Sequence, residues 1–224
     1  MFGKLFGRGD EGSGPFYRPY RIKAANHIYN LLFCDNPALF KSSDDGGGAL
    51  SAVLSDSTDR EALETIGNDI DAESRVRALA FNRLRLMQVP VPPKRLLGTI
   101  IEFPQRDGLD TLAIFPDGRL RYINQSEGMA IFEASPPALI YKAEEVLRAS
   151  QIAVNHNEPS GEPRQPPPTG ELVRLSLLAS DGLYLCEDEF DDLGTDRFAA
   201  PIMAAASDLL PLLVKEALRK NRGT

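Results

Sequence analysis

Three Asp-Gly dipeptides beyond residue 100 constrain the fold of this chain more than any other feature. They are Asp107-Gly108, Asp117-Gly118 and Asp181-Gly182, and each stands between short apolar runs. Asp-Gly is a strong signal for a β-hairpin, because glycine adopts positive φ without a clash at Cβ. The pattern predicts an antiparallel sheet, a meander followed by a later hairpin. Its expected strands are residues 97–103, 110–115, 119–124 and 129–133 in the meander, and 172–180 and 183–187 in the hairpin.

The strand predicted at residues 119–124 alternates in polarity. Leu120 and Tyr122 fall on one of its faces, and Arg119 and Arg121 fall on the other. This alternation is typical of an antiparallel sheet with one face against the core and the other in water. We therefore expect helices on one face of the sheet.

Residues 15–93 carry helical patterns instead. A helix is expected at residues 24–33, where apolar side chains recur on one side. Another is expected to open at Thr58, because Thr58 and Glu61 have the spacing of a capping box. A third is expected at residues 72–87, and the three prolines that follow it forbid its continuation. The first half of the chain is thus predicted to be helical.

Proline and glycine mark the remaining boundaries. Residues 42–51 are expected to form a loop, and they lack the Gly-Lys-Ser/Thr of a phosphate-binding loop. Residues 135–150 predict a helix that begins with a serine cap and two prolines. Residues 158–170 are too rich in proline for regular structure and should lie extended on the surface. A last helix is expected at residues 200–218, kinked or split at Pro211.

These elements predict an α+β fold. A helical N-terminal part at residues 15–93 follows a flexible tail at residues 1–14. Residues 94–224 are then expected to form an α+β domain, in which helices cover the antiparallel sheet and a Pro-rich surface loop occupies residues 158–170. A chain of 224 residues is long enough to bury a substantial core.

Composition narrows the classes of partner. The net charge of −7 opposes binding to nucleic acid or anionic lipid, so a protein with a basic surface is the expected partner. No run approaches the roughly 20 apolar residues of a membrane span, and we expect a cytoplasmic protein. Cys34 and Cys186 match no Cys-x-x-Cys pattern, which favours reduced thiols over a disulfide. No cofactor is predicted.

The strongest local anomaly is an acidic run near the second strand of the late hairpin. Its members are Glu187, Asp188, Glu189, Phe190, Asp191 and Asp192, with Asp196 beyond them. The run lacks the alternation and the glycine of a calcium loop, so a metal site is not predicted. One interpretation is a loop that presents its charge, with Phe190 as an apolar anchor, to a basic partner. The other is a solvated loop that leads into the last helix, whose dipole favours nearby carboxylates.

Basic residues gather between Arg75 and Arg95, with no acidic residue among them. On a helical wheel they point in several directions, and this argues against a track for phosphates. We expect these arginines to pair with acidic loops of the same chain or to lay their stems over the edge of the core.

The sequence contains no recognisable catalytic motif. Its two histidines are His27 and His156, and Cys34 lies seven residues after His27. A Cys-His nucleophile would also need an orienting group and an oxyanion hole, neither of which is visible. His156 borders the Pro-rich loop, where a solvated imidazole is expected. The common hydrolase, zinc and dinucleotide motifs are missing, although a site assembled from distant residues leaves no local motif.

The segments LLGTIIEF, GLDTLAIFPDGRLRYINQS and SDGLYL resemble a family of bacterial proteins of unassigned function. The resemblance spans Leu96 to about Leu185 and implies a bacterial origin and no activity. The leading hypothesis is a non-enzymatic protein-binding module of the bacterial cytoplasm, for example a toxin-neutralising immunity protein. One alternative is a small-molecule sensor or an enzyme with a pocket between the sheet and the C-terminal helix, near Tyr122, Asn124 or Tyr184. Another is a scaffold subunit of an assembly.

Overall fold

The computed structural model describes residues 14–41 and 48–222. The predicted flexible tail lies outside the described residues apart from Gly14, as does most of the predicted loop at residues 42–51. The helices are α1 (Lys23–Leu31), α2 (Ala49–Leu54), α3 (Arg60–Asn68), α4 (Ser74–Leu86), α5 (Pro137–His156), α6 (Phe190–Leu193) and α7 (Ala199–Arg222), with a 3₁₀ turn η1 (Pro37–Phe40). The strands are β1 (Leu96–Gln105), β2 (Gly108–Ile114), β3 (Leu120–Ile123), β4 (Met129–Phe132), β5 (Leu172–Ala179) and β6 (Gly182–Glu189).

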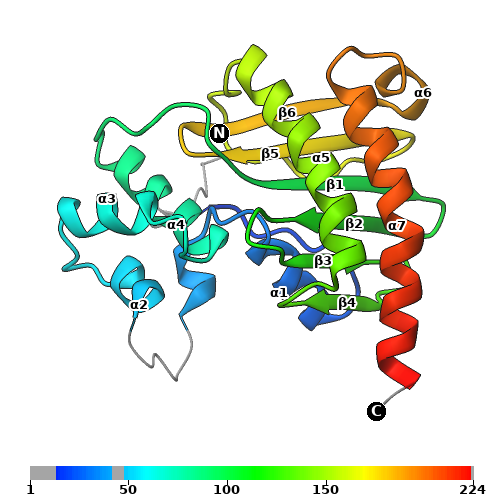
Figure 1. Cartoon of the computed structure of the whole chain (residues 1–224), viewed down its shortest axis with the longest axis horizontal. Coiled ribbons are helices and arrows are strands. Elements are labelled where there is room, and N and C mark those ends of the chain that lie inside the picture. Colours follow the sequence, from blue (N-terminus) through cyan, green and yellow to red (C-terminus); the bar gives the residue numbers. More distant parts are fainter. Residues whose placement is uncertain (1–13, 42–47, 223–224) are drawn as a thin grey trace, which may run out of the picture.

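The six strands form one antiparallel sheet in the order β4-β3-β2-β1-β5-β6. This confirms the predicted α+β class, a meander followed by a hairpin. Each Asp-Gly dipeptide stands at a turn between neighbouring strands, and Gly118 adopts the positive φ of 81° that its turn requires. After β4 the chain returns through α5 and the Pro-rich segment, so that β5 pairs with the open side of β1 (Figure 1).

Helices α5 and α7 cover one face of the sheet (Figure 1). Ile101, Leu112 and Leu175 point from the strands into this layer and are buried with Val146 and Leu209 of the two helices. Both the sheet residues and the helix residues of this cluster are apolar. Their burial is the main contribution that α5 and α7 make to the stability of the fold.

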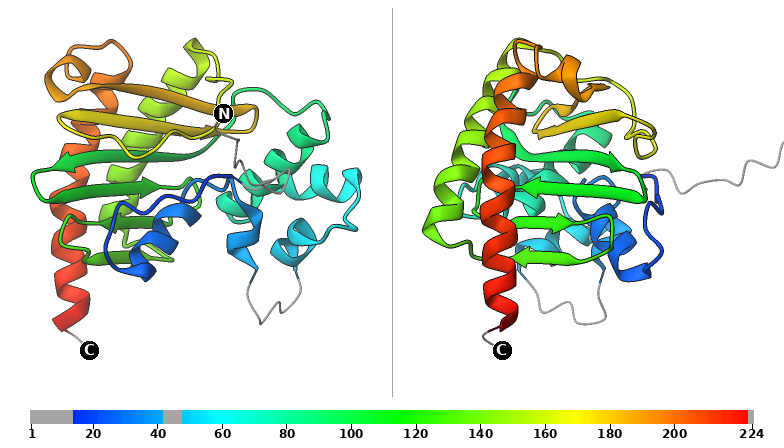
Figure 2. Two further views of the ribbon diagram at one scale, coloured as in Figure 1. Left: turned by 180° about the vertical axis from the view of Figure 1, so that it is seen from behind. Right: turned by 90° about the vertical axis from the view of Figure 1, so that its right-hand side faces the viewer.

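The opposite face is covered as well, which differs from the expectation of a wet side. Leu97, Ile100 and Phe115 of this face are buried in a cluster with Tyr29 of α1 and Phe81 of α4. Seen from behind, α1 lies over the sheet and α2, α3 and α4 stand beside one end of its strands (Figure 2). The N-terminal helices and the sheet therefore share a core.

Arg121 shows what this second layer does to a strand. Its side chain was expected in water, but the residue is only 3% exposed. Its Nη1 donates to the carbonyls of Leu120 and Phe132 over 2.9 and 2.7 Å, and its Nη2 pairs with Glu133. The alternation of the strand is as predicted, but the second face is closed by the N-terminal part of the chain, so the arginine is buried while its partner Glu133 stays exposed.

Several boundaries differ from those predicted. Thr58 donates its hydroxyl to the carbonyl of Ala52, and Asp59 instead caps α3 by accepting from the amide of Ala62 over 2.8 Å. Residues 49–51, predicted as loop, belong to α2. Helix α7 continues through Pro211 without splitting. Pro211 is exposed, so the backbone hydrogen bond that proline cannot make is missing on the solvent side.

The Pro-rich segment, residues 158–170, has no helix or strand, as predicted. It does not lie wholly on the surface, however, because Arg164 and Pro168 are buried. Tyr17 donates its hydroxyl to the carbonyl of Arg164 over 3.0 Å, and Arg174 of β5 donates to the carbonyl of Pro166 over 2.5 Å. We call this segment the Pro-rich strap, since it crosses from α5 to β5 over the N-terminal layer. No helix in the described ranges is long and apolar enough to span a membrane.

Candidate functional site

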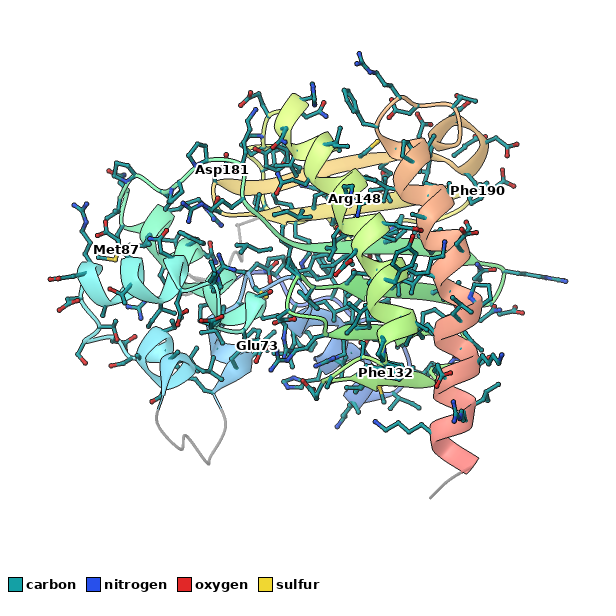
Figure 3. All side chains as sticks on the ribbon, viewed as in Figure 1. Glu73, Met87, Phe132, Arg148, Asp181 and Phe190 are labelled. Atoms are coloured by element: carbon teal, nitrogen blue, oxygen red, sulfur yellow. The ribbon has the colours of Figure 1, made fainter. Side chains whose placement is uncertain are left out.

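The acidic run does not form a loop. Glu187, Asp188 and Glu189 are the last three residues of β6, and Phe190, Asp191 and Asp192 begin the short helix α6. Strand β6 is an edge of the sheet, so the acidic residues lie at one border of the molecule. Phe190 is 52% exposed there, at the end formed by α6 (Figure 3).

Two of the carboxylates have partners inside the fold. Glu187 pairs with Arg174, which lies opposite it on β5, with 2.7 Å between Nε and Oε2. Asp196 accepts from the amides of Phe198 and Ala199 over 2.8 and 2.7 Å at the start of α7. These residues fit the interpretation in which the run leads into the last helix.

The other four carboxylates face solvent, as either interpretation predicts. Asp188, Glu189, Asp191 and Asp192 are exposed and have no ion pair among the residues that the structure describes. They also do not converge, since no group of three His, Cys, Asp or Glu in the described part of the chain is arranged to hold a metal ion. The border of the sheet thus carries negative charge that the fold itself leaves unbalanced.

The outer side of β6 is open along most of its length. Near its start, the amide of Ser160 donates to the carbonyl of Leu183 over 2.8 Å, which marks Leu183 as a residue whose backbone points away from β5. Backbone groups alternate in direction along an antiparallel strand. Leu185 and Glu187 therefore direct their amide and carbonyl groups outward, and neither has a backbone partner on that side within the described ranges.

The predicted histidine and cysteine residues are far from forming a nucleophile. His27 is exposed on α1, whereas Cys34 is 3% exposed beyond the end of that helix, with a φ of 53°. The thiol of Cys34 is directed at the carbonyls of Leu31 and Leu32, 3.7 Å away, and burial raises its pKa. A thiol held neutral in this way is a poor nucleophile. His156 is exposed and stacks on Phe198, with 5.3 Å between ring centroids.

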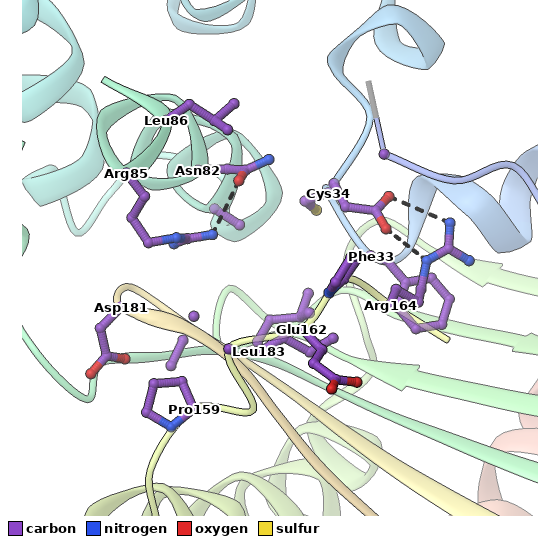
Figure 4. A pocket seen from close by; sticks show the side chains of 18 of the residues that line it. Phe33, Cys34, Asn82, Arg85, Leu86, Pro159, Glu162, Arg164, Asp181 and Leu183 are labelled. Atoms are coloured by element: carbon purple, nitrogen blue, oxygen red, sulfur yellow. Dashed lines mark hydrogen bonds and ion pairs between the residues drawn. The ribbon is translucent and has the colours of Figure 1, made fainter. Parts of the chain in front are cut away.

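A cavity of about 550 Å³ is formed by five separate parts of the chain (Figure 4). These are Gly14 and Pro15, the segment just after α1, helix α4, the Pro-rich strap, and the end of β5 with the turn into β6. We call it the hairpin cleft. Its walls include Phe33, Asn82, Arg85, Glu162, Leu178 and Leu183. A mainly apolar cavity of this size with a few polar groups is typical of small-molecule sites.

Arg85 is the cation of α4 in the hairpin cleft. Its Nη1 donates to the carbonyl of Ser180 over 2.6 Å, and its Nη2 donates to Oδ1 of Asn82 over 3.2 Å. Burial lowers the pKa of Arg85, and no carboxylate of the described residues lies within ion-pair distance of it. The sequence predicted that arginines of this stretch pair with acidic loops or lay their stems over the edge of the core. Arg85 donates to neutral oxygens, and the carboxylate of Asp181 lies nearby but beyond ion-pair distance.

A smaller cavity of about 220 Å³ lies between the sheet and the N-terminal end of α7. Tyr184 and Cys186 of β6 line it together with Asp196. The other two residues expected near such a pocket lie elsewhere. Tyr122 donates to Asp110 over 3.0 Å, and Asn124 closes the turn before β4 by accepting from the amide of Gly128.

A buried ionic layer lies between the sheet and α1. Glu102 of β1 stands opposite Arg174 of β5, and it accepts from the hydroxyl of Tyr29 over 2.7 Å. Its second oxygen is buried without a partner among the described atoms. Burial raises the pKa of Glu102 to about 7. Sequence reasoning missed this layer, although a glutamate inside LGTIIEF and an arginine inside LVRLSLL were visible signals.

Comparison with protein families, curated proteins and solved structures found no match for this chain. The functional conclusion therefore depends on the geometry of the β6 edge and the hairpin cleft.

Proposed function

We propose that this chain is a non-enzymatic protein-binding module of a bacterial cytoplasm, and that it binds a basic partner at the open edge of β6. The partner would add an extended strand to the sheet. A toxin-neutralising immunity protein is one concrete form of this proposal. The bacterial and cytoplasmic parts of the proposal follow from the expected resemblance of residues 96–185 and from the composition of the chain.

The observation that supports strand addition is the outward direction of the backbone at Leu185 and Glu187. An edge strand with unpaired amides and carbonyls is a template for another chain, and many proteins cover or shorten such edges. Among the residues that the structure describes, the Pro-rich strap has a hydrogen bond to β6 at Leu183 alone. The rest of the strand is left as a site for β-augmentation, in which main-chain hydrogen bonds supply affinity and side-chain contacts supply specificity.

The charge of this edge supports a basic partner. Asp188, Glu189, Asp191 and Asp192 are exposed without counter-ions in the described structure, and they repel one another. A partner with lysine or arginine on its added strand relieves this repulsion and is steered to the edge by it. Phe190 supplies an exposed aromatic contact beside the charges, as binding surfaces often do.

A synthetic strand tests the proposal. We would use a peptide of alternating lysine and valine that matches the eight residues of β6, and the same peptide with glutamate in place of lysine. Binding would be measured by fluorescence anisotropy at several salt concentrations. The basic peptide should bind, with an affinity that falls as salt rises, and the acidic peptide should not. Equal binding of both peptides would contradict the role of charge.

Variants of Leu185 separate backbone pairing from charge. Leu185→Pro removes the outward amide and keeps every carboxylate. It should also keep the hydrogen bonds between β5 and β6, because the neighbouring residues make them. Leu185→Ala is the matched control for loss of the side chain. The proline variant should lose binding, and the alanine variant should retain it. If the proline variant does not fold, hydrogen exchange on the unaltered protein decides, since the peptide should protect the amides of Leu185 and Glu187.

A further inference from the structure

Arg85 is half-buried, and it differs from the buried arginines in what it faces. Three of them have a carboxylate partner: Arg121 with Glu133, Arg164 with Asp35, and Arg174 with Glu187. A guanidinium taken out of water is costly unless it is paired. Arg85 lacks such a partner within the described structure and lines the hairpin cleft.

Two further arginines also lack a carboxylate partner, but their position compensates for it. Arg77 donates to the carbonyl of Gly67 near the end of α3, and Arg83 donates to the carbonyls of Val53 and Ser55 at the end of α2. The carbonyl end of a helix carries partial negative charge, which stabilises a cation there. Arg85 instead meets a turn carbonyl and an amide, and the nearby carboxylate of Asp181 acts on its charge from beyond ion-pair distance.

The guanidinium of Arg85 has donors left for a ligand. Arginine has five N–H donors, and the two described bonds, to Ser180 and Asn82, use one each. In Figure 4 the guanidinium projects from α4 toward the space between Asn82 and Pro159. Three donors in a planar fork suit a carboxylate or a phosphate, either of which accepts two parallel hydrogen bonds.

The other walls select among anions. Phe33, Leu178 and Leu183 offer apolar surface, so the body of the ligand is apolar. Three carboxylates line the cleft. Asp35 is paired with Arg164, Glu162 has no ion pair among the described residues, and Asp181 accepts from the amide of Lys94 and the hydroxyl of Tyr184. A second negative charge on the ligand would be repelled by Glu162 and Asp181. A single negative charge is therefore favoured over a doubly charged phosphate.

We propose that the hairpin cleft binds a small apolar molecule with one carboxylate group, which Arg85 holds by charge-assisted hydrogen bonds. The site is separate from the β6 edge and does not depend on the protein-binding proposal. It also differs from the pocket expected between the sheet and the last helix, because it lies on the other face, against α4 and the Pro-rich strap.

A series of eight-carbon probes tests the chemistry of the site. Octanoate, octanol and octyl phosphate would each be titrated into the full chain and followed by isothermal titration calorimetry and by NMR shifts. Octanoate should bind and shift the amides of Ala179 and Leu183 together with the Nε–H of Arg85. Octanol, which lacks the charge, should bind about tenfold more weakly or worse, as expected for loss of a charge-assisted hydrogen bond.

Two variants test the residues. Arg85→Met should weaken octanoate binding about tenfold or more while leaving octanol unchanged. Leu183→Trp should block both probes by filling the cleft, and it decides the matter if the methionine variant does not fold. The proposal is overturned if octanoate shifts no signal at the cleft, if Arg85→Met keeps full affinity, or if octyl phosphate binds more tightly than octanoate.

Discussion

Arg164 donates through Nε to Oδ2 of Asp35 over 2.7 Å, although the two residues are 129 positions apart. The guanidinium also lies over the ring of Phe33, 4.2 Å from its centroid, and donates to the carbonyl of Pro15. One side chain thus fastens the Pro-rich strap to the segment around α1. The buried position of this contact makes it a main determinant of where the strap lies.

Arg164→Met should release the strap and destabilise the protein. Removing one partner of a buried ion pair typically costs about 3–5 kcal/mol, because the other charge stays behind unpaired; Asp35 is partly exposed, so we expect the lower end. Urea unfolding measures the loss, and limited proteolysis should show new cleavage within residues 158–170. The double variant Arg164→Met with Asp35→Asn should recover part of the stability. Unchanged proteolysis would show that other contacts hold the strap.

Glu102 should make the stability of the protein depend on pH. Burial raises the pKa of Glu102 from 4.5 to about 7, so between these pH values the folded protein keeps a proton that the unfolded chain releases. Stability from this group is therefore greatest below pH 4.5 and falls as pH rises to about 7, by up to an amount on the order of 3 kcal/mol. Glu102→Gln, which cannot titrate, should flatten unfolding curves measured across this range. An equally steep dependence in the variant would assign it to other groups.

Asp196 should contribute to the start of α7 through its hydrogen bonds and not through its charge. Asp196→Ala removes the acceptor for the amides of Phe198 and Ala199 and should cost about 1 kcal/mol. Asp196→Asn keeps the oxygen and should cost less than half of that. Thermal unfolding of the two variants provides the comparison. Equal losses would mean that charge near the helix end, and not capping, is what matters.

The two cysteines should differ strongly in reactivity. Cys186 is exposed, whereas Cys34 is buried with its pKa raised by burial. A thiol reagent added to the native protein should modify one group quickly and the second only as the protein unfolds. Cys186→Ser should abolish the fast phase, and Cys34→Ser should leave it intact. Fast modification of both groups would contradict the burial of Cys34.

Local patterns in the sequence predicted the local structure well. The Asp-Gly turns predicted the hairpins because a turn of this kind depends on neighbouring residues alone. The pairing of β5 with β1 depends on residues about 75 positions apart, and nothing in either strand identifies the other. Glu102 and Arg174 lie opposite each other as a result of that pairing, so their position could not be predicted from the sequence either.

The candidate sites were predictable only in part. The acidic run was visible, but its division into a paired Glu187, a capping Asp196 and four exposed carboxylates depends on how β6 joins the sheet. Arg85 appeared as one of several arginines in a helix with no clear stripe. Arg85 differs from the other arginines of α4 because the β5–β6 turn and the Pro-rich strap form the hairpin cleft beside it. Those segments follow Arg85 by about 75 residues or more, so the sequence around Arg85 does not indicate the cleft.

The central place of β1 in the sheet has a consequence for synthesis on the ribosome. Strands β1 to β4 emerge in order and can pair as they appear, but the second edge of β1 waits until β5 has left the exit tunnel. During that interval Glu102 has no Arg174 opposite it, and an unpaired strand edge in the middle of the future sheet faces solvent. Nascent chains with such unpaired strand edges are prone to aggregate and are bound by chaperones. The tendency of this protein to aggregate during synthesis should therefore fall once β5 has emerged and paired with β1.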